Sequence, residues 1–527
     1  MPAGGRADAQ DPGENLASYA SASSDDRQPH RRAVCRRRSG LSMTHAFASR
    51  TWLNATLLAG VALLVGVLAG KHPNYAVALG ALAFVTLLAF VAPVTHLTIL
   101  LVLTTIVPYS IEGLYHAGGA GAGNGGLQAS DLFLLTGLLR AALVLPRLRL
   151  TRRQVTVVSL VVISCAFTIF EAYQGFRAGQ SVANVGAEFR ALAGGFAFVL
   201  IALTTLEDRG AHRRMLRALV VMGLMLGLWG IAQWTLGVAF NSTDFGVRAG
   251  VSLTSNGVGQ LQGGLFAFPI AVTLSFAALA SGHLRSRRER AVVATVLVLN
   301  AVSLLLTFER TFWVATGVAI LLVALRSGRA RRARAMLATL ACVIVGVTVL
   351  AAVSPTTLQT AEQRLLSIGQ YQTDLSVRSR AVESGFVIDK IHAKPLFGWG
   401  LADTIYWGQP WTQTPPSAQS YTHVGYLWLL WREGILGGGV LLLLLALSCV
   451  WPGRARGGDL VAVIKMGSQV SIIALLIINL TFPVFSQGSQ ATYMLGLLVA
   501  YCALPTLSRR AAGSGRGSGI APVPVPS

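Results

Sequence analysis

The feature that most constrains this chain is the recurrence of long apolar blocks, each bounded by short polar tracts. Most blocks run for about 17 to 25 residues, the length that an α-helix needs to cross a bilayer. Only 12% of the residues are charged, against about 25% in soluble domains. The pattern therefore predicts an all-α polytopic membrane protein with about 12–14 transmembrane helices. The candidate blocks are 51–70, 74–93, 95–110, 130–146, 154–172, 191–206, 218–239, 257–281, 291–308, 311–325, 336–354, 424–449, 460–483 and 490–505.

The formal net charge of +22 is concentrated in arginine-rich tracts between these blocks. Lys and Arg in short connections favour the cytoplasmic side of a membrane. One topology puts every basic tract on that side, with both termini cytoplasmic and the alternate connections outside. Arginines placed between membrane spans in this way argue against nucleic-acid binding. The tracts are 147–153, 207–217, 283–290, 326–334 and 453–459.

Composition changes along the chain predict five regions. The first 50 residues show no hydrophobic period, which is typical of a disordered tail, and Met43 is an alternative start. The regions are a cytoplasmic tail (1–50), N-terminal transmembrane helices (51–240), a candidate catalytic region (241–450), C-terminal transmembrane helices (451–505) and a second cytoplasmic tail (506–527).

The connection 355–422 is far longer than the usual helix–helix connection of about two to eight residues. A long insertion on the outer face of a helical bundle indicates a site or a lid. We expect it to contain two short amphipathic helices and a capping segment on the membrane. Its Trp407, Trp411 and Tyr421 could stack on sugar rings, although an interfacial aromatic belt is an equally good interpretation.

Five arginines lie on the predicted outer face, where the positive-inside rule disfavours them. Arg310 stands between two apolar blocks, where it could pair with Glu309, anchor the interface, or face a cavity. With four further outer arginines nearby, an anion-binding cavity is the better interpretation, because guanidinium groups bind phosphate oxygens with two hydrogen bonds. The other four are Arg190, Arg248, Arg378 and Arg380.

His423 lies where the long outer connection enters a helix. Such a histidine is most often a packing or capping residue. It is also the usual general base for a hydroxyl, because its pKa lies near neutrality. Should His423 not serve, the base must be sought among the outer carboxylates, or catalysis rests on stabilisation of a leaving group alone. The outer carboxylates are Glu362, Asp374, Glu383, Asp389 and Asp403.

Nothing in the sequence suggests a metal site or another cofactor. The chain has no CxxC pair and no His, Cys or Asp cluster with ligand spacing. We interpret the five cysteines as small packing residues. They are Cys35, Cys165, Cys342, Cys449 and Cys502.

Several short motifs between about 240 and 440 resemble the O-antigen ligase/polymerase family. "TFERTFWVA" is similar to the family's "SRxxW" helix start, with Arg310 as the arginine. "RAGVSLTSNGVGQLQGGL", residues 248–265, is similar to its "GTFxxPN" entry into a helix. Val424 and Glu309 depart from the family's usual Asn and Ser. The main motif is Arg380, Pro395, Gly398, Gly400, His423, Glu433, Gly434 and Gly437.

This resemblance implies a metal-independent glycosyltransferase in the bacterial inner membrane that acts at the outer face. Its donor would be a glycan on undecaprenyl diphosphate, and its acceptor a hydroxyl of a lipid, glycan or protein. Arg310 and Arg380 would bind the diphosphate, with Arg378, Arg190 and Arg248 near it. His423 would take the acceptor proton. Glu433 would fix its helix or orient His423, Tyr421 would lie beside the site, and Arg432 would form an ion pair.

Three alternatives stay open at this point. A polymerase would extend the glycan on its lipid carrier, whereas a ligase would move it to another acceptor. A flippase for the same lipid-linked sugars would show two similar halves, and no such repeat is visible. A glycan-binding scaffold without catalysis would leave Arg310 unexplained.

Overall fold

A computed structural model describes the greater part of the chain. The described residues are 73–106, 128–236, 251–253, 259–261, 265–284, 286–327, 351–352, 354–366, 375–408, 417–450, 460–486 and 491–505, with single positions between 333 and 348. The predicted tails, 1–50 and 506–527, and the first apolar block, 51–70, lie outside them. The chain divides into two compact units, Met1–Gly80 and Ala81–Ser527, and the packing below is that of the second unit.

Nearly all described elements are α-helices, which confirms the predicted fold class. The helices are α2 (Pro73–Val91), α3 (Pro93–Thr105), α5 (Ala129–Val144), α6 (Arg152–Arg177), α7 (Val182–Thr205), α8 (Arg209–Leu236), α9 (Ala267–Ser281), α10 (Arg287–Leu305), α11 (Arg310–Arg326), α13 (Pro355–Leu366), α14 (Leu375–Ala393), α15 (Gly425–Val450), α16 (Leu460–Ile478) and α17 (Ala491–Ala503). Two short antiparallel strand pairs complete them, β1 (Val251–Leu253) with β2 (Gly259–Leu261) and β3 (Ile405–Trp407) with β4 (Ser417–Gln419).

Within the described residues, 6 helices are long and apolar enough to cross a membrane. They are Ala129–Arg147, Arg152–Arg177, Val182–Thr205, Arg209–Thr235, Gly425–Val450 and Val461–Ile478. Shorter apolar helices stand beside them, so the chain is a multi-pass membrane protein. The described part of the long connection 355–422 holds two helices, α13 and α14, as the sequence predicts, but α14, with 19 residues, is longer than the short helix expected.

Local signals in the sequence explain where these helices begin and end. Thr151 accepts a hydrogen bond from the Gln154 N–H and forms a capping box that starts α6. Ser286 and Glu289 form the same box at α10. Gly282 ends α9 in the left-handed conformation that glycine adopts without strain.

Small residues allow α8 and α10 to pack closely. A Cβ on Gly227 would overlap Leu299, and one on Gly230 would overlap Ser303. The Asn300 side chain donates to the Gly223 carbonyl (2.8 Å), which helps to hold the two helices in register. Close backbone approach with polar cross-links is the typical packing of helices in lipid.

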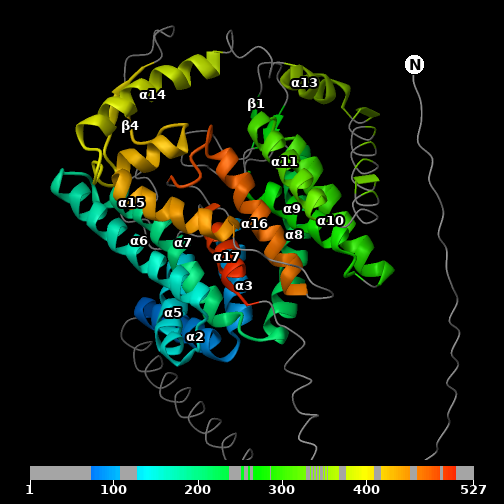
Figure 1. Ribbon diagram of the computed structural model, residues 1–527, viewed down its shortest axis with the longest axis horizontal. Helices are drawn as coiled ribbons and strands as arrows, with labels where there is room; N and C mark the ends of the chain where they lie inside the picture. Colours follow the sequence, from blue (N-terminus) through cyan, green and yellow to red (C-terminus); the bar gives the residue numbers. More distant parts are fainter. Residues whose placement is uncertain are drawn as a thin grey trace, which may run out of the picture. The chain divides into compact units, whose positions relative to one another are not determined.

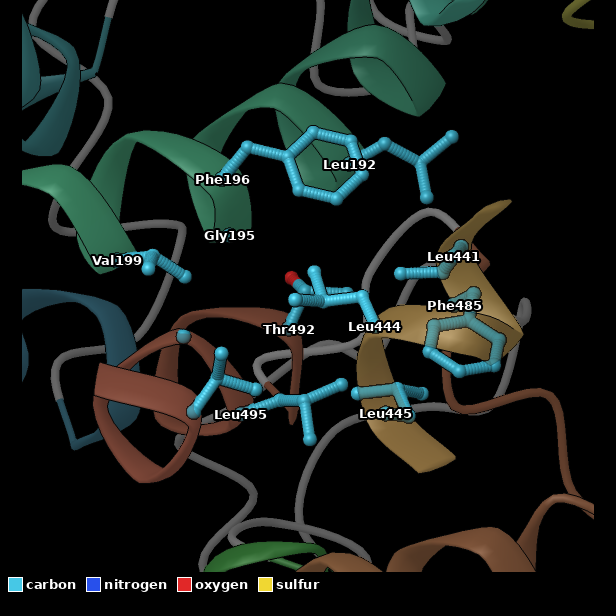
Figure 2. A pocket seen from close by; sticks show the side chains of 12 residues that line it. Leu192, Gly195, Phe196, Val199, Leu441, Leu444, Leu445, Phe485, Thr492 and Leu495 are labelled. Atoms are coloured by element: carbon cyan, nitrogen blue, oxygen red, sulfur yellow. The ribbon is translucent and has the colours of Figure 1, made fainter. Parts of the chain in front are cut away.

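Apolar side chains fill the space between α7, α15 and α17. Figure 2 shows a small apolar cavity there, with Phe196 and Val199 facing Leu441 and Leu445. Almost all of its lining is hydrocarbon, so this part of the bundle is a packed core rather than a site for a sugar or a phosphate.

Candidate active site

Helix α14 carries the predicted Arg378 and Arg380 and two of the candidate carboxylates, Glu383 and Asp389, and packs against α15, as Figure 1 shows. Its inner face is apolar at Val387, which is fully buried against Ile405 and Trp431. Burial of an aliphatic side chain of this size stabilises the contact by about 1.5–3 kcal/mol. The helix is therefore fixed on the bundle, and the residues one turn before Val387 have defined positions.

His423 is held by a carboxylate of that helix. The Glu383 carboxylate accepts a hydrogen bond from the His423 backbone N–H (2.8 Å), and its other oxygen lies 2.7 Å from Nδ1 of the ring. An ionised carboxylate can only accept, so Nδ1 carries a proton and Nε2 of the neutral ring keeps its lone pair. Glu383 is 1% exposed and the His423 side chain 33% exposed. The pair therefore has a buried carboxylate that orients an accessible imidazole.

Tyr421 lies beside this pair. Its ring meets the imidazole of His423 edge to face, with the centroids 5.5 Å apart. Burial, together with the nearby Glu383 carboxylate, raises the pKa of the Tyr421 phenol above its ordinary value. The phenol is therefore neutral at physiological pH. Its ring contact with the imidazole restricts how the His423 ring can turn.

Arg380 is close to the same carboxylate along α14. Arg380 and Glu383 are three residues apart, so they lie on one face of the helix. Arg380 is half-buried, and its Nε is shielded from solvent without a hydrogen-bond partner among the described residues. Arg378, two positions earlier, is exposed. The face of α14 that contacts His423 through Glu383 thus also carries the Arg380 guanidinium, whose Nε–H is available to donate to a ligand.

Arg310 begins α11 at the same end of the bundle as His423. The Thr481 hydroxyl donates to that of Thr311 (2.7 Å), which ties the start of α11 to the end of α16. The Gly425 N–H donates to the Asn479 carbonyl (2.9 Å), which ties the start of α15 to the same turn. Arg310 and His423 therefore flank one turn, although they are far apart in sequence.

The glycine motifs form a backbone interlock between the segment after α14 and a break in α15. Gly434 interrupts α15 with φ 63°. The N–H of Ile435 donates to the Pro395 carbonyl (2.9 Å), and that of Gly400 to the Arg432 carbonyl (3.2 Å). A Cβ on Gly434 would overlap the Leu396 carbonyl oxygen. Only glycine allows this approach, which sets α14 relative to α15.

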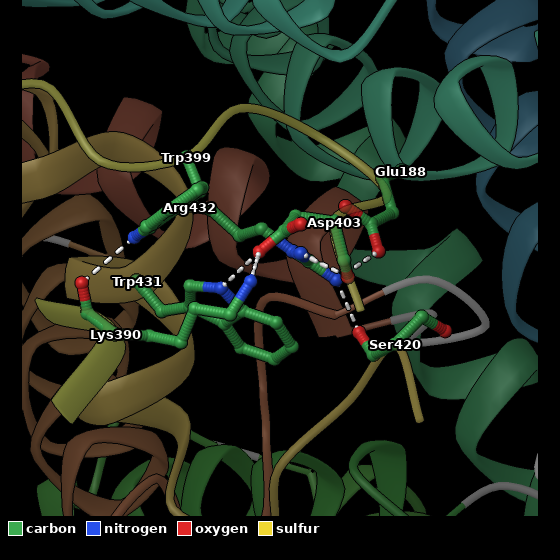
Figure 3. Close-up of polar contacts among 7 residues, drawn as sticks. All are labelled: Glu188, Lys390, Trp399, Asp403, Ser420, Trp431 and Arg432. Carbon is green, nitrogen blue, oxygen red and sulfur yellow. Dashed lines mark hydrogen bonds and ion pairs between the residues drawn. The ribbon is translucent and has the colours of Figure 1, made fainter. Parts of the chain in front are cut away.

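A buried ion pair extends this interlock to α7. Arg432 is fully buried, and its Nη2 donates to Glu188 (2.9 Å) and to the Ser420 carbonyl, as Figure 3 shows. Its Nη1 donates to the Asp403 carbonyl (2.5 Å). The other Glu188 oxygen accepts from the Ala402 N–H (2.7 Å), where the backbone has φ 63°. Arg432 thus holds the segment that ends three residues before His423.

The Asp403 carboxylate closes the network on the α14 side. It accepts from the Trp431 indole N–H (2.8 Å) and from the Lys390 ammonium (2.9 Å). Lys390 also lies 4.1 Å from the centre of the Trp399 ring. Lys390 is on α14, which carries Glu383, and Ser420 lies three residues before His423. One network therefore fixes both segments that supply the Glu383–His423 pair (Figure 3).

Five predicted residues lie away from this pair or outside the described residues. Arg190 forms an ion pair with Asp131 (2.9 Å), which joins α7 to α5. Glu433 accepts from the Thr168 hydroxyl (3.1 Å), so it fixes α15 on α6, while the residue that orients His423 is Glu383. Trp407 is buried in the apolar cluster under α14 rather than presented to a sugar. Arg248 and Trp411 lie outside the described residues.

Metal-ligating side chains do not gather in the described part of the chain: no group of three or more His, Cys, Asp or Glu there could hold an ion. Of the cysteines, Cys165, Cys449 and Cys502 are free thiols among apolar side chains.

Comparison with known proteins identifies the region that contains this site. The sequence model of the O-antigen ligase family matches residues 295–443. The match begins in α10 and ends in α15, so it includes Arg310, Arg380, Glu383 and His423. No curated protein matches the sequence. Residues 295–443 therefore match the O-antigen ligase family, within an α-helical, multi-pass membrane protein.

Proposed function

We propose that this protein is a glycosyltransferase that moves a glycan from an undecaprenyl-diphosphate carrier to an acceptor hydroxyl in surface polysaccharide or lipopolysaccharide synthesis. The observation that carries the proposal is the Glu383–His423 pair on the α14–α15 contact, with Arg380 on the same helix face. An oriented base beside guanidinium groups suits a reaction that deprotonates a hydroxyl and releases a diphosphate.

The reaction breaks one bond at the anomeric carbon and forms another. His423 accepts the acceptor's proton at Nε2 while the acceptor oxygen bonds to the anomeric carbon of the donor. The bond from that carbon to the diphosphate oxygen breaks, and its electron pair leaves with the lipid diphosphate. Negative charge grows on the leaving oxygens, so Arg310 and Arg380 stabilise the transition state more than the ground state. Arg378 supplies further positive charge near the donor, and the role of Arg248, which lies outside the described residues, stays a prediction from the sequence.

The same reasoning favours an active site on the outer face of the inner membrane. Basic connections follow the C-terminal ends of α7, α9 and α11. Arg310 and His423 lie instead at the N-terminal ends of α11 and α15. With basic connections cytoplasmic, both termini are cytoplasmic and the donor site faces outward. Reporter fusions at residues 330 and 390 test this: a cytoplasmic 390 would refute the site assignment.

A polysaccharide polymerase is the second candidate, because the same base and arginines can extend a lipid-linked glycan. A flippase is less well supported, since the candidate site gathers at one end of the bundle rather than along a path through it. A non-catalytic glycan-binding scaffold would need neither an oriented base nor a guanidinium with unused donors.

The decisive assay uses the purified protein with an undecaprenyl-diphosphate-linked glycan. Release of undecaprenyl diphosphate that depends on an added acceptor supports a ligase. Longer glycans on the lipid carrier, formed without added acceptor, support a polymerase. Activity should survive excess EDTA, because arginines rather than a cation neutralise the leaving group. Loss of activity in EDTA, restored by Mg²⁺ or Mn²⁺, would contradict that part of the mechanism.

A further inference from the structure

A large cavity lies at the end of the bundle away from His423. Its volume is about 1410 Å³, and its lining comes from α8, α9, α10, α16, α17 and the end of α11. The walls are mainly aliphatic, with Leu226, Ile270 and Val296 among the lining residues. A cavity of this size and chemistry accommodates hydrocarbon chains rather than sugars.

Four arginines surround the cavity at its polar end. Arg213 and Arg217 belong to the first turns of α8, Arg288 to the first turn of α10, and Arg326 to the last turn of α11. All four are exposed, and Glu289 is the acidic residue among the lining. An apolar interior with an arginine rim is complementary to an amphiphile that has a negatively charged head.

His283 provides a second, independent observation. It lines the same cavity, and both its ring nitrogens are shielded from solvent without a hydrogen-bond partner among the described residues. A shielded nitrogen without a partner costs free energy, so a ligand oxygen in this position would be favoured. A phosphate oxygen can accept from the imidazole N–H as well as from the neighbouring guanidinium groups.

We propose that this cavity binds an anionic phospholipid, with its acyl chains between α8, α9 and α10 and its phosphate at the arginine rim. The length of the cavity agrees with that of a phospholipid. Arg213 and Leu226, which both line it, are 13 residues apart on α8, or about 20 Å along the helix axis. That distance matches an extended acyl chain. The cavity lies at the opposite end of α11 from Arg310, apart from the proposed donor site.

The lipid acts as a structural ligand of the helices that line the cavity. The cavity lies where α8 and α9 make little direct contact, while α10 packs against both. Filling it therefore stabilises the folded bundle by mass action. This inference does not depend on the proposed glycosyl transfer, and its test does not measure activity.

The test uses the full-length protein, purified in detergent, stripped of lipid and then titrated with phosphatidylglycerol. We expect phosphatidylglycerol to bind, detected by native mass spectrometry, and to raise the midpoint of thermal unfolding. Phosphatidylcholine with the same acyl chains should do so much less. Equal binding and equal stabilisation by the two lipids would overturn the proposal, and so would no binding of either.

Matched pairs of arginine variants locate the site. Arg217→Ala with Arg288→Ala removes two rim residues, whereas Arg214→Ala with Arg290→Ala removes two exposed arginines of the same helix starts that do not line the cavity. One arginine near an anionic lipid is worth roughly a fivefold change in affinity, so the rim pair should weaken binding on the order of thirtyfold. Equal losses in the two pairs would show that surface charge, not the cavity, holds the lipid.

A third variant tests the apolar part of the cavity. Ala278 lines it from α9, and Ala278→Phe places a ring in the space assigned to the acyl chains while the arginines stay intact. We expect it to displace phosphatidylglycerol. Undiminished binding to a folded Ala278→Phe protein would refute the location of the acyl chains.

Discussion

Replacing Glu383 by Gln removes one acceptor without changing the size of the side chain. In the wild type, one carboxylate oxygen accepts from the His423 backbone N–H (2.8 Å) and the other pairs with Nδ1 (2.7 Å). A glutamine offers only one oxygen for these two donors. The backbone N–H cannot change its role, so the oxygen stays with it and the new NH₂ group faces Nδ1.

The imidazole must then accept at Nδ1, and its proton moves to Nε2. The nitrogen that faces the acceptor hydroxyl thereby loses its lone pair. General-base catalysis contributes about 10²- to 10⁴-fold in rate, so kcat of Glu383→Gln should fall by about that factor. The donor KM should change little, because Arg310 and Arg380 are untouched. Turnover of the lipid-linked donor by the purified protein measures both quantities.

Asp389→Asn is the matched control, since Asp389 is an exposed carboxylate on the same helix. It should keep near-wild-type kcat. The double variant Glu383→Gln/His423→Ala should be no slower than His423→Ala alone, because the two residues act as one unit. Wild-type turnover by Glu383→Gln, or losses that multiply in the double variant, would refute the proposed orientation of His423.

Three further perturbations test the surrounding structure. Glu188→Ala leaves the buried Arg432 without its carboxylate and should cost about 3–5 kcal/mol of stability, seen as a lower thermal midpoint. Gly434→Ala should destabilise by about 1–3 kcal/mol, because φ is 63° there, whereas Gly439→Ala, which meets no atom within 4 Å, should not. Arg310→Ala should raise the donor KM and lower kcat, and Arg310→Lys should restore only part of both, because an ammonium lacks the two-pronged geometry. An unchanged thermal midpoint in Glu188→Ala would contradict the role of the buried ion pair. Equal effects of Gly434→Ala and Gly439→Ala would contradict the need for glycine at 434, and full rescue by Arg310→Lys would contradict two-pronged binding.

The helices could be predicted because bilayer length and helix caps are local properties of the sequence. The block 424–449 corresponds to α15, Gly425–Val450, and the block 130–146 to α5, Ala129–Val144. The predicted helices of the long connection are also present, as α13 and α14. In each case hydropathy or charge over about 20 neighbouring residues carries the information.

The contacts inside the site could not be predicted in this way, because they join residues far apart in the chain. Glu383 and His423 are separated by 40 positions, and Glu188 and Arg432 by 244. A hydrophobic period reflects only neighbouring residues, so it does not predict which distant side chains form a pair. One signal was available for Glu383: it lies three residues after Arg380, on the face of a helix that carries a predicted site residue. Glu433 is nearer to His423 in sequence, yet it points to α6.

Whether His423 is the general base is tested by a single-turnover comparison of wild type with His423→Ala, using the purified protein and an undecaprenyl-diphosphate-linked glycan. Both proteins must first be shown to be folded and in the membrane fraction. We predict that His423→Ala binds the donor with nearly unchanged affinity but transfers the glycan about 10²- to 10⁴-fold more slowly. Transfer at a near-wild-type rate would contradict the account, because His423 would then have only a structural role.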